Sequence, residues 1–360
     1  TAFAGMLGSN AGRGMASVFT AVRGSPNAEF LFGATHRMQS DYKDGDGQLI
    51  SNTGNHISTG LAKGTFRPAD GHEVKVGVIL QENLFNVGQY NRGDVSTAAQ
   101  RALNQGSSVY ATDLHNTTAT VRWKYYRPDD NVFNWDLSAY KNRTSSDQTK
   151  IAHLSNTAQA GVCTTPGNDI SGCVGDQRRY VLNTLGFDGN NTMRFNFGEW
   201  QNAVTFGGDI FQDDVTTSDT SGNSNVTTPG GVRTVSGAFV QWKSTWANWL
   251  EVVSAARYDN SQLESGDTSA SGSRLSPKVT VGITPIKGVT PYVSYAEGYR
   301  APSITETLVA GAHSSGGGPA LFNCPGGGGG LFCFLPNPNL RPEVGKNAEV
   351  GLNLKFDNIF

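Results

Sequence analysis

Apolar and polar residues alternate strictly along several segments of about ten residues. Between His115 and Tyr126, one set of alternate positions holds alanine, valine, tryptophan and tyrosine, whereas the intervening set holds threonine, arginine and lysine. Because successive side chains of a strand point to opposite faces, this period of two predicts strands with one apolar and one polar face. The clearest segments are His72–Leu80, His115–Tyr126, Val132–Asn142 and Asn347–Phe356. Weaker alternation predicts strands at Ala16–Arg23, Glu29–Arg37, Ser58–Arg67, Asn191–Gly198, Asn202–Gln212, Val232–Lys243, Asn248–Asp259, Ser273–Thr284 and Val289–Glu297, about thirteen in all.

The connections between these strands alternate between short turns and long polar loops. The predicted long loops are Met38–Ile57, Glu82–Leu114, Arg143–Asn190, Asp213–Gly231, Asn260–Gly272 and Gly298–Lys346. Loops of this length are unusual in a compact soluble domain. Short periplasmic turns that alternate with long extracellular loops are typical of outer-membrane barrels. The pattern therefore predicts an all-β fold, a transmembrane antiparallel β-barrel.

The tryptophans support a membrane setting. All six lie in or within about five residues of a predicted short turn: Trp123, Trp135, Trp200, Trp242, Trp246 and Trp249. An indole has an apolar body and a polar N–H, which suits the boundary between lipid and water. We therefore expect an aromatic girdle at the periplasmic end of the barrel.

Composition argues against several classes of protein. The 360 residues carry a net charge of −2, so nothing indicates a nucleic-acid partner. The mean hydropathy is −0.36, and no run approaches 18 apolar residues, which excludes a transmembrane helix. A search for long apolar runs does not detect barrel strands, because alternate residues face the lumen and can be polar. No nucleophile triad, paired-carboxylate motif or phosphate loop is present, so an enzyme is not expected.

The four cysteines form two close pairs within loops rich in glycine, proline and serine. Neither pair has the spacing of a metal site, and no histidines stand at ligand distance. We therefore predict two loop disulfides, Cys163 with Cys173 and Cys324 with Cys333, and an oxidising compartment outside the cytoplasm.

The predicted strands do not make a complete barrel. Thr1 opens inside a strand, and Thr1–Leu7 has the pattern of one further strand tail. An odd number of strands would leave unpaired edges in lipid, and bacterial barrels normally have an even number. We therefore expect residues 1–360 to be part of a larger barrel, with any targeting segment outside it, and Asp357–Phe360 to lie in a short turn.

The longest loop and its flanks carry the motifs that are most informative about function. They read Tyr299-Arg300-Ala301-Pro302, then His313, then Asn337-Pro338-Asn339-Leu340 followed by Arg341-Pro342-Glu343. In order and spacing they resemble TonB-dependent heme receptors, whose hallmark is a FRAP box, a histidine in the next extracellular loop and an NPNL box. The first box departs from that pattern by Tyr299 in place of phenylalanine.

The resemblance implies a 22-stranded outer-membrane barrel, filled by an N-terminal plug that this chain does not contain. It implies that heme, free or taken from hemoglobin or another hemoprotein, is a transported ligand, with no permanently bound cofactor. Energy would come from the TonB–ExbB–ExbD complex acting through the plug. Residues 298–346 would form the extracellular loop that carries the two boxes.

By the same resemblance His313 would be an axial ligand of the heme iron. Neutral imidazole binds iron well, and an exposed loop can close over a ligand that arrives from outside. The alternative is a solvated loop histidine. The proline and asparagine residues of the boxes can act by shaping the loop alone. Arg300 and Arg341 could meet heme propionates or a hemoprotein surface, or pair with Glu306, Glu343 or lipopolysaccharide phosphates.

Other functions remain open from the sequence. A TonB-dependent receptor for ferric siderophores would share the barrel, and a passive porin or adhesin would share its wall. A soluble β-rich hydrolase conflicts with the alternating loops and lacks a nucleophile motif. The boxes around His313 favour heme among these alternatives.

Overall fold

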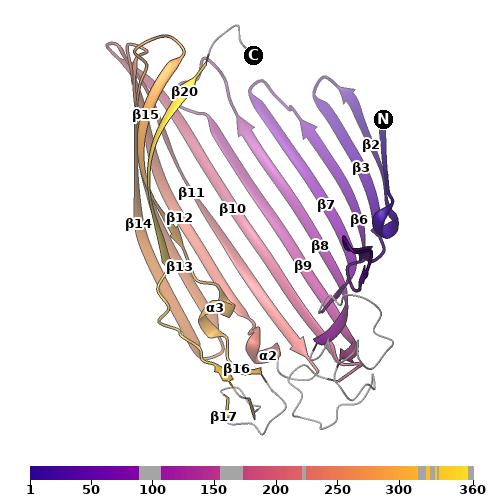
Figure 1. Ribbon diagram of the computed structural model, residues 1–360. Coiled ribbons are helices and arrows are strands. Elements are labelled where there is room, and N and C mark those ends of the chain that lie inside the picture. Colours follow the sequence, from indigo (N-terminus) through magenta and orange to yellow (C-terminus); the bar gives the residue numbers. More distant parts are fainter. Residues whose placement is uncertain are drawn as a thin grey trace.

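A computed structural model describes residues 1–88, 107–154, 173–220, 224–314, 322–324, 329–330 and 332–355. Its main feature is a fourteen-stranded sheet in which each strand pairs antiparallel with its neighbours along the chain (Figure 1). Its strands are β1 (Ala2–Gly8), β2 (Arg13–Ser25), β3 (Ala28–Gln39), β6 (Asn55–Phe66), β7 (His72–Val87), β8 (Ser107–Tyr125), β9 (Trp135–Leu154), β10 (Gln177–Phe197), β11 (Trp200–Asp219), β12 (Gly231–Trp246), β13 (Leu250–Ser265), β14 (Thr268–Ile283), β15 (Val289–Arg300) and β20 (Glu343–Leu354).

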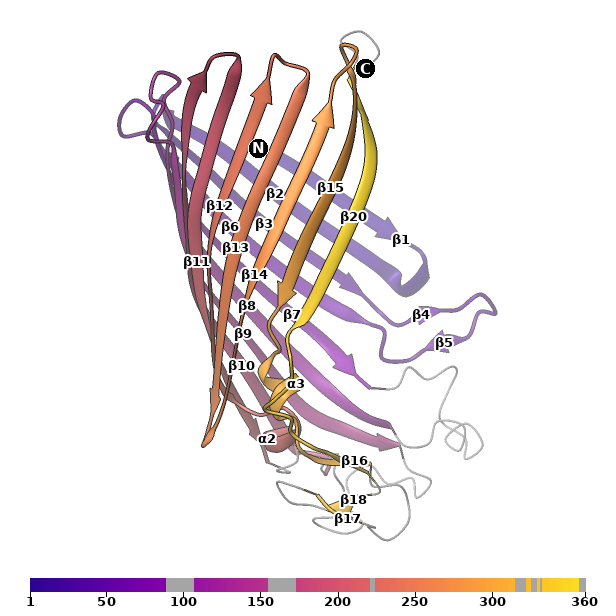
Figure 2. The same cartoon turned by 90° about the vertical axis from the view of Figure 1, so that its left-hand side faces the viewer.

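All thirteen strands predicted from the alternation are confirmed, and β1 occupies the predicted strand tail at Thr1–Leu7. The sheet curves strongly, so that β2 and β3 lie behind β12–β14 when viewed from the side (Figure 2). Among the described residues, β1 pairs only with β2, and β20 pairs only with β15. These two strands are the edges of the sheet. The total of 22 strands stays a prediction.

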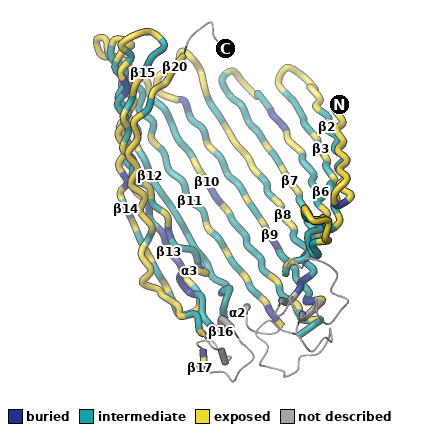
Figure 3. Tube along the Cα trace, in the orientation of Figure 1, coloured by how far each residue is buried: buried dark blue, intermediate teal, exposed yellow. Residues whose placement is uncertain are grey.

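The apolar residues of neighbouring strands form continuous rows on one face. Val76 of β7 lies opposite Val121 of β8, which lies opposite Ala139 of β9, which in turn lies opposite Phe187 of β10. Directly paired residues share a face, so the sheet has one largely apolar wall. Figure 3 shows that exposed and half-buried residues follow one another along the strands and that few residues are buried. An exposed apolar wall of this extent suits lipid contact.

The opposite face is polar and concave. Arg122 of β8 donates to Asp136 of β9 on this face, with Nε 2.6 Å from Oδ1. The short helix α3 (Ile304–Leu308) packs on the same face, where Ile304 and Leu308 bury themselves against Leu263 of β13. In Figure 2, α3 lies inside the curve of the sheet. The polar face therefore corresponds to the lumen side of a barrel wall.

The short turns gather at one end of the sheet, which is the upper end in Figure 1. The tryptophans contact one another there, with ring centroids 5.3 Å apart for Trp123–Trp135 and 5.2 Å apart for Trp246–Trp249. Trp200 also stacks on Trp246, to which it is paired across β11 and β12. The predicted girdle of tryptophans at the short-turn end is therefore present.

The strands extend further toward the long-loop end than the sequence predicts. The predicted long loop Asn260–Gly272 is wrong, because β13 and β14 pair as far as Ser265 and Thr268. Gly266 makes the tight turn between them with a φ of 54°. Apart from Leu263 and Ala270, which belong to the apolar cluster under α3, the segment is polar, so it lacks the alternation that marks lipid-facing strands. A strand that projects beyond the membrane meets water on both faces and needs no apolar positions.

The remaining elements are small and lie mostly at the long-loop end. They are η1 (Asn10–Gly12), β4 (Tyr42–Lys43), β5 (Leu49–Ile50), α2 (Ser224–Thr227), β16 (Gly311–Ser314), β17 (Phe322–Asn323), β18 (Gly329–Gly330) and β19 (Phe332–Phe334). In the described part of the chain, helices are too short and too polar to span a membrane.

Candidate functional site

The two sequence boxes meet at the long-loop ends of adjacent strands. Strands β15 and β20 are paired along their whole length, and the last pair places Arg300 opposite Glu343. The chain between them, from Ala301 to Pro342, leaves the sheet and returns to the same point. This register brings the YRAP and NPNL boxes together, although residues 303–336 separate them in the sequence.

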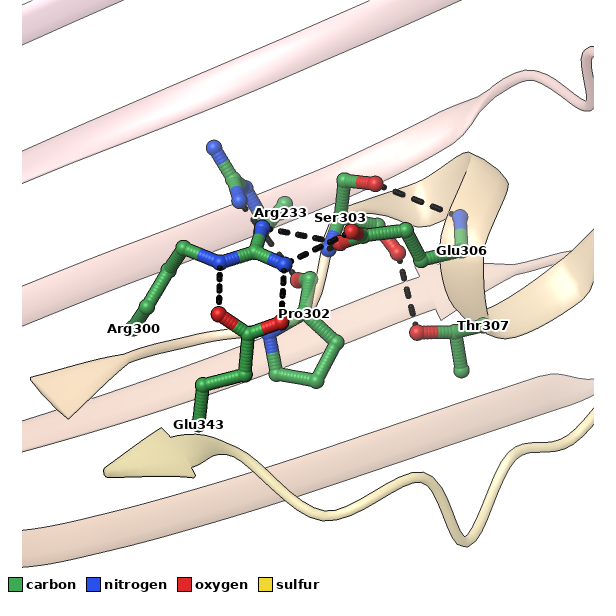
Figure 4. Close-up of polar contacts among 7 residues, drawn as sticks. All are labelled: Arg233, Arg300, Pro302, Ser303, Glu306, Thr307 and Glu343. Carbon is green, nitrogen blue, oxygen red and sulfur yellow. Dashed lines mark hydrogen bonds and ion pairs between the residues drawn. The ribbon is translucent and has the colours of Figure 1, made fainter. Parts of the chain in front are cut away.

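Arg300 fastens the two ends of this loop to each other (Figure 4). Its Nε and Nη2 each donate to one carboxylate oxygen of Glu343, both at 2.8 Å. Its Nη1 and Nη2 also donate to Glu306 of α3, at 3.1 and 2.7 Å. Two bidentate pairs on one guanidinium give a defined geometry that single surface ion pairs lack. Of the roles considered for Arg300, the structure thus shows pairing with Glu306 and Glu343.

Helix α3 begins immediately after the first box and is held by a capping box. The Ser303 hydroxyl accepts from the Glu306 backbone N–H at 3.2 Å, and the Glu306 carboxylate accepts from the Ser303 N–H at 2.8 Å. The sequence Ser303-x-x-Glu306 is the signature of this motif, so the start of α3 is marked in the sequence. Glu306 therefore caps the start of α3 and also pairs with Arg300.

The remaining residues of the first box anchor it to the neighbouring strands. The Tyr299 hydroxyl lies 2.8 Å from the Ser261 hydroxyl of β13 and donates to the Gly272 carbonyl of β14 at 3.3 Å. A Cβ at Gly272 would lie only 3.3 Å from the Tyr299 hydroxyl, so glycine permits this approach. Ala301 is buried, and the Pro302 carbonyl accepts from Arg233 at 3.5 Å.

The NPNL box forms a turn that is tied to α3. The Asn337 backbone N–H donates to the Thr307 carbonyl of α3 at 2.7 Å. The Asn337 side chain accepts from the Asn339 N–H at 3.2 Å, and its carbonyl accepts from the Leu340 N–H at 3.0 Å. Pro338 lies inside this turn, where its fixed φ is favourable. In the structure both boxes shape and fasten the loop.

His313 lies in β16, which pairs with β19. Ala312 lies opposite Cys333 and Ser314 lies opposite Phe332, so His313 is the additional residue of a bulge. Cys333 also forms a disulfide with Cys324, with Cα atoms 5.3 Å apart, as its spacing predicts. The disulfide therefore links Cys324 to β19, the strand that pairs with the strand containing His313.

The other predicted disulfide can be followed only in part. Cys173 is disulfide-bonded, but Cys163 lies outside the described residues. The pairing Cys163–Cys173 therefore stays a prediction.

The polar face next to the loop base holds a hollow of about 580 Å³. Its wall combines aromatic and charged side chains, including Phe211, Phe239, Arg257 and Lys278. Arg257 forms ion pairs with two carboxylates: its Nη1 lies 2.8 Å from Asp209 Oδ1, and its Nε lies 2.7 Å from Asp259 Oδ1. The ammonium of Lys278 has no ion pair in the part of the chain that the structure describes. Such a wall can accept a flat apolar ligand that carries an acidic group.

The ion pairs of Arg300 with Glu306 and Glu343 make the two ends of the loop from Ala301 to Pro342 sensitive to acid. Hydrogen bonds from Arg300, and then from Ser303, lower the pKa of Glu306 to about 2 from its ordinary 4.5. A lowered pKa in the folded state means that the stabilising contribution is complete above about pH 4.5 and is lost as the pH falls toward about 2. We expect hydrogen exchange at the α3 amides to be slow at pH 5 and to rise sharply below pH 3, after correction for intrinsic rates. In Glu306→Gln this step should be much smaller, and an equal step in both proteins would contradict the assignment.

Comparison with known proteins gives the family. The model described as TonB dependent receptor-like, beta-barrel matches residues 34–360. The heme/hemopexin utilization protein C of Haemophilus influenzae is 27% identical over 260 residues, which is 71% of this chain and 32% of that protein. The chain thus spans about a third of the length of this curated relative.

Two solved structures show the same fold. The hemophore receptor HasR of Serratia marcescens, in a complex with its hemophore HasA and heme, superposes with a TM-score of 0.76 at 19% identity. That match covers 99% of this chain and 51% of HasR. The siderophore receptor PirA from Acinetobacter baumannii gives a TM-score of 0.67 at 13% identity, over 96% of this chain and 48% of PirA. The chain therefore belongs to the TonB-dependent receptor-like β-barrel family, whose members are transport proteins of the Gram-negative outer membrane and not enzymes.

Proposed function

We propose that this chain is part of the barrel wall of a receptor that binds heme at the cell surface and imports it with energy from TonB. The observation that carries the proposal is the placement of His313. It stands in a loop whose two ends carry the YRAP and NPNL boxes, and these ends are fastened to each other by Arg300 of the first box and Glu343, which follows the second box. When both ends of a loop are anchored to the barrel, a ligand residue in the loop can extend over the lumen while its position relative to the barrel stays defined.

The hollow beside the loop base supports the same ligand. Heme is a large flat apolar ring with two carboxylates, and the hollow offers aromatic walls and the Lys278 ammonium. The relatives named for heme or hemin support the choice of heme over other cargo. Hemopexin, hemoglobin or another hemoprotein would be the source, and the TonB–ExbB–ExbD complex would act through a plug domain.

The second candidate is a receptor for ferric siderophores. The similarity to PirA favours it, because the barrel wall is shared between receptors of different cargo. A siderophore needs no imidazole ligand, whereas heme in our proposal does. A passive porin is disfavoured by the family match over residues 34–360.

Titration of the purified receptor with heme separates the two candidates. We expect tight binding of one heme and the absorption spectrum of histidine-ligated low-spin iron. A ferric hydroxamate and a ferric catecholate siderophore serve as competitors and should leave that spectrum unchanged. Absence of heme binding, or displacement of heme by a siderophore, would overturn the heme assignment in favour of the second candidate.

A further inference from the structure

A group of metal-ligating side chains lies on the apolar face, away from the loop base. Glu82 of β7 is paired directly with His115 of β8, and Asp113 lies two residues from His115 on the same strand. Paired residues and residues two apart share a face, so the three side chains project from the same side of the sheet. Val76, Val78 and Leu80 continue this row on β7 toward the short-turn end. We call Glu82, Asp113 and His115 the β7–β8 cluster.

The ligand atoms of the cluster converge. One oxygen from each carboxylate and one imidazole nitrogen all lie within 4.8 Å of one another. His115 Nε2 is 3.0 Å from Asp113 Oδ1. That oxygen is shielded from solvent and accepts no hydrogen bond from the described residues. The geometry points to a binding site for a divalent transition-metal ion, of the Zn²⁺ class, formed by Glu82, Asp113 and His115.

The donor set and its charge fit such an ion. Zn²⁺ binds imidazole nitrogen and carboxylate oxygen at about 2.0–2.2 Å, so tetrahedral ligands lie about 3.4 Å apart. The ligand atoms now lie within 4.8 Å of one another, so binding would require side-chain rotations that close them to that spacing. Among the described residues, the carboxylate of Glu82 has no ion pair and the carboxylate of Asp113 pairs only with His115. A dication would neutralise both carboxylates, and water would complete its coordination.

The cluster lies near the outer edge of the apolar band and not at its middle. His115 precedes Trp123 of the girdle by eight positions. At ~3.4 Å per residue and a tilt of about 40°, this places His115 roughly 20 Å from the girdle along the membrane normal. The apolar band of such barrels is about 25 Å tall, so the cluster lies near its outer boundary. Charged ligands are tolerated at that level, and ions from the medium can reach them. This site is on the opposite face from the proposed heme path and does not depend on it.

The test is titration of the purified, chelator-treated receptor in detergent with Zn²⁺ alone, followed by calorimetry. We expect one Zn²⁺ per chain in the wild type. Loss of an outer-shell partner already weakens metal sites by about 10–100-fold, so His115→Ala and Glu82→Gln should each weaken binding at least about tenfold. Co²⁺ in place of Zn²⁺ should give visible absorption bands that His115→Ala removes.

His36→Ala is the matched control. His36 occupies the same face on β3, where Nδ1 lies 3.1 Å from the Ser58 hydroxyl, outside the cluster. It should bind Zn²⁺ as the wild type does. Heat-modifiable mobility on gels confirms that each variant is folded. Failure of the wild type to bind Zn²⁺, or equal binding by the wild type, His115→Ala and Glu82→Gln, would overturn the proposal whatever the receptor does with heme.

Discussion

Replacing His313 by Ala is expected to abolish growth on heme as sole iron source while the receptor remains in the outer membrane. The imidazole is the proposed iron ligand, and alanine offers no donor to replace it. Each ~1.4 kcal/mol lost from binding raises Kd tenfold, so loss of an iron–nitrogen bond should weaken heme binding by well over about tenfold. The purified variant should also lose the low-spin histidine spectrum.

Two controls make the His313 result specific. Ser314→Ala changes the next residue of β16 and removes no nitrogen donor, so heme growth should be retained. Surface abundance of each variant, measured by antibody labelling of intact cells, separates lost binding from lost assembly. If His313→Ala takes up heme and shows the wild-type spectrum, His313 is not the ligand and the heme must be held elsewhere.

The fold could be predicted wherever lipid imposes a pattern on the sequence. Within the membrane each strand needs apolar residues at alternate positions, and all thirteen predicted strands were found. Outside the membrane that constraint ends, so the polar extensions of β9, β10, β13 and β14 lack the alternation that predicts a strand. Alternation therefore does not predict the turn at Gly266, although a Gly-Asp pair is a common turn signal.

The candidate site was predictable as a set of motifs but not as an arrangement. The sequence placed the two boxes at the ends of one loop, and the register of β15 and β20 then joined them through Arg300 and Glu343. Strand register and the hydrogen bond from Asn337 to Thr307 depend on tertiary contacts, which one sequence does not encode locally. The capping box at Ser303 and Glu306 was the one local signal that the sequence did contain.

A pair of arginine substitutions on one strand should distinguish the two faces of the wall. Val240 and Gln241 are neighbours on β12 and therefore project to opposite faces. Val240 is exposed on the apolar face, opposite Phe206 and Ala256, six positions from Trp246 at the short-turn end. Gln241 lines the hollow on the polar face. At ~3.4 Å per residue and a tilt of about 40°, Val240 lies roughly 16 Å above that end, near the middle of the apolar band.

Val240→Arg should therefore destabilise the receptor far more than Gln241→Arg. An arginine on the lipid face near the midplane costs about 2–4 kcal/mol, because its charge must leave water or distort the bilayer, whereas a lumen arginine stays hydrated. Urea titration of each variant folded into phosphatidylcholine vesicles measures the difference, and outer-membrane abundance should follow the same order. Equal unfolding free energies for the two variants would mean that Val240 does not face lipid, and that the apolar wall is covered by protein instead.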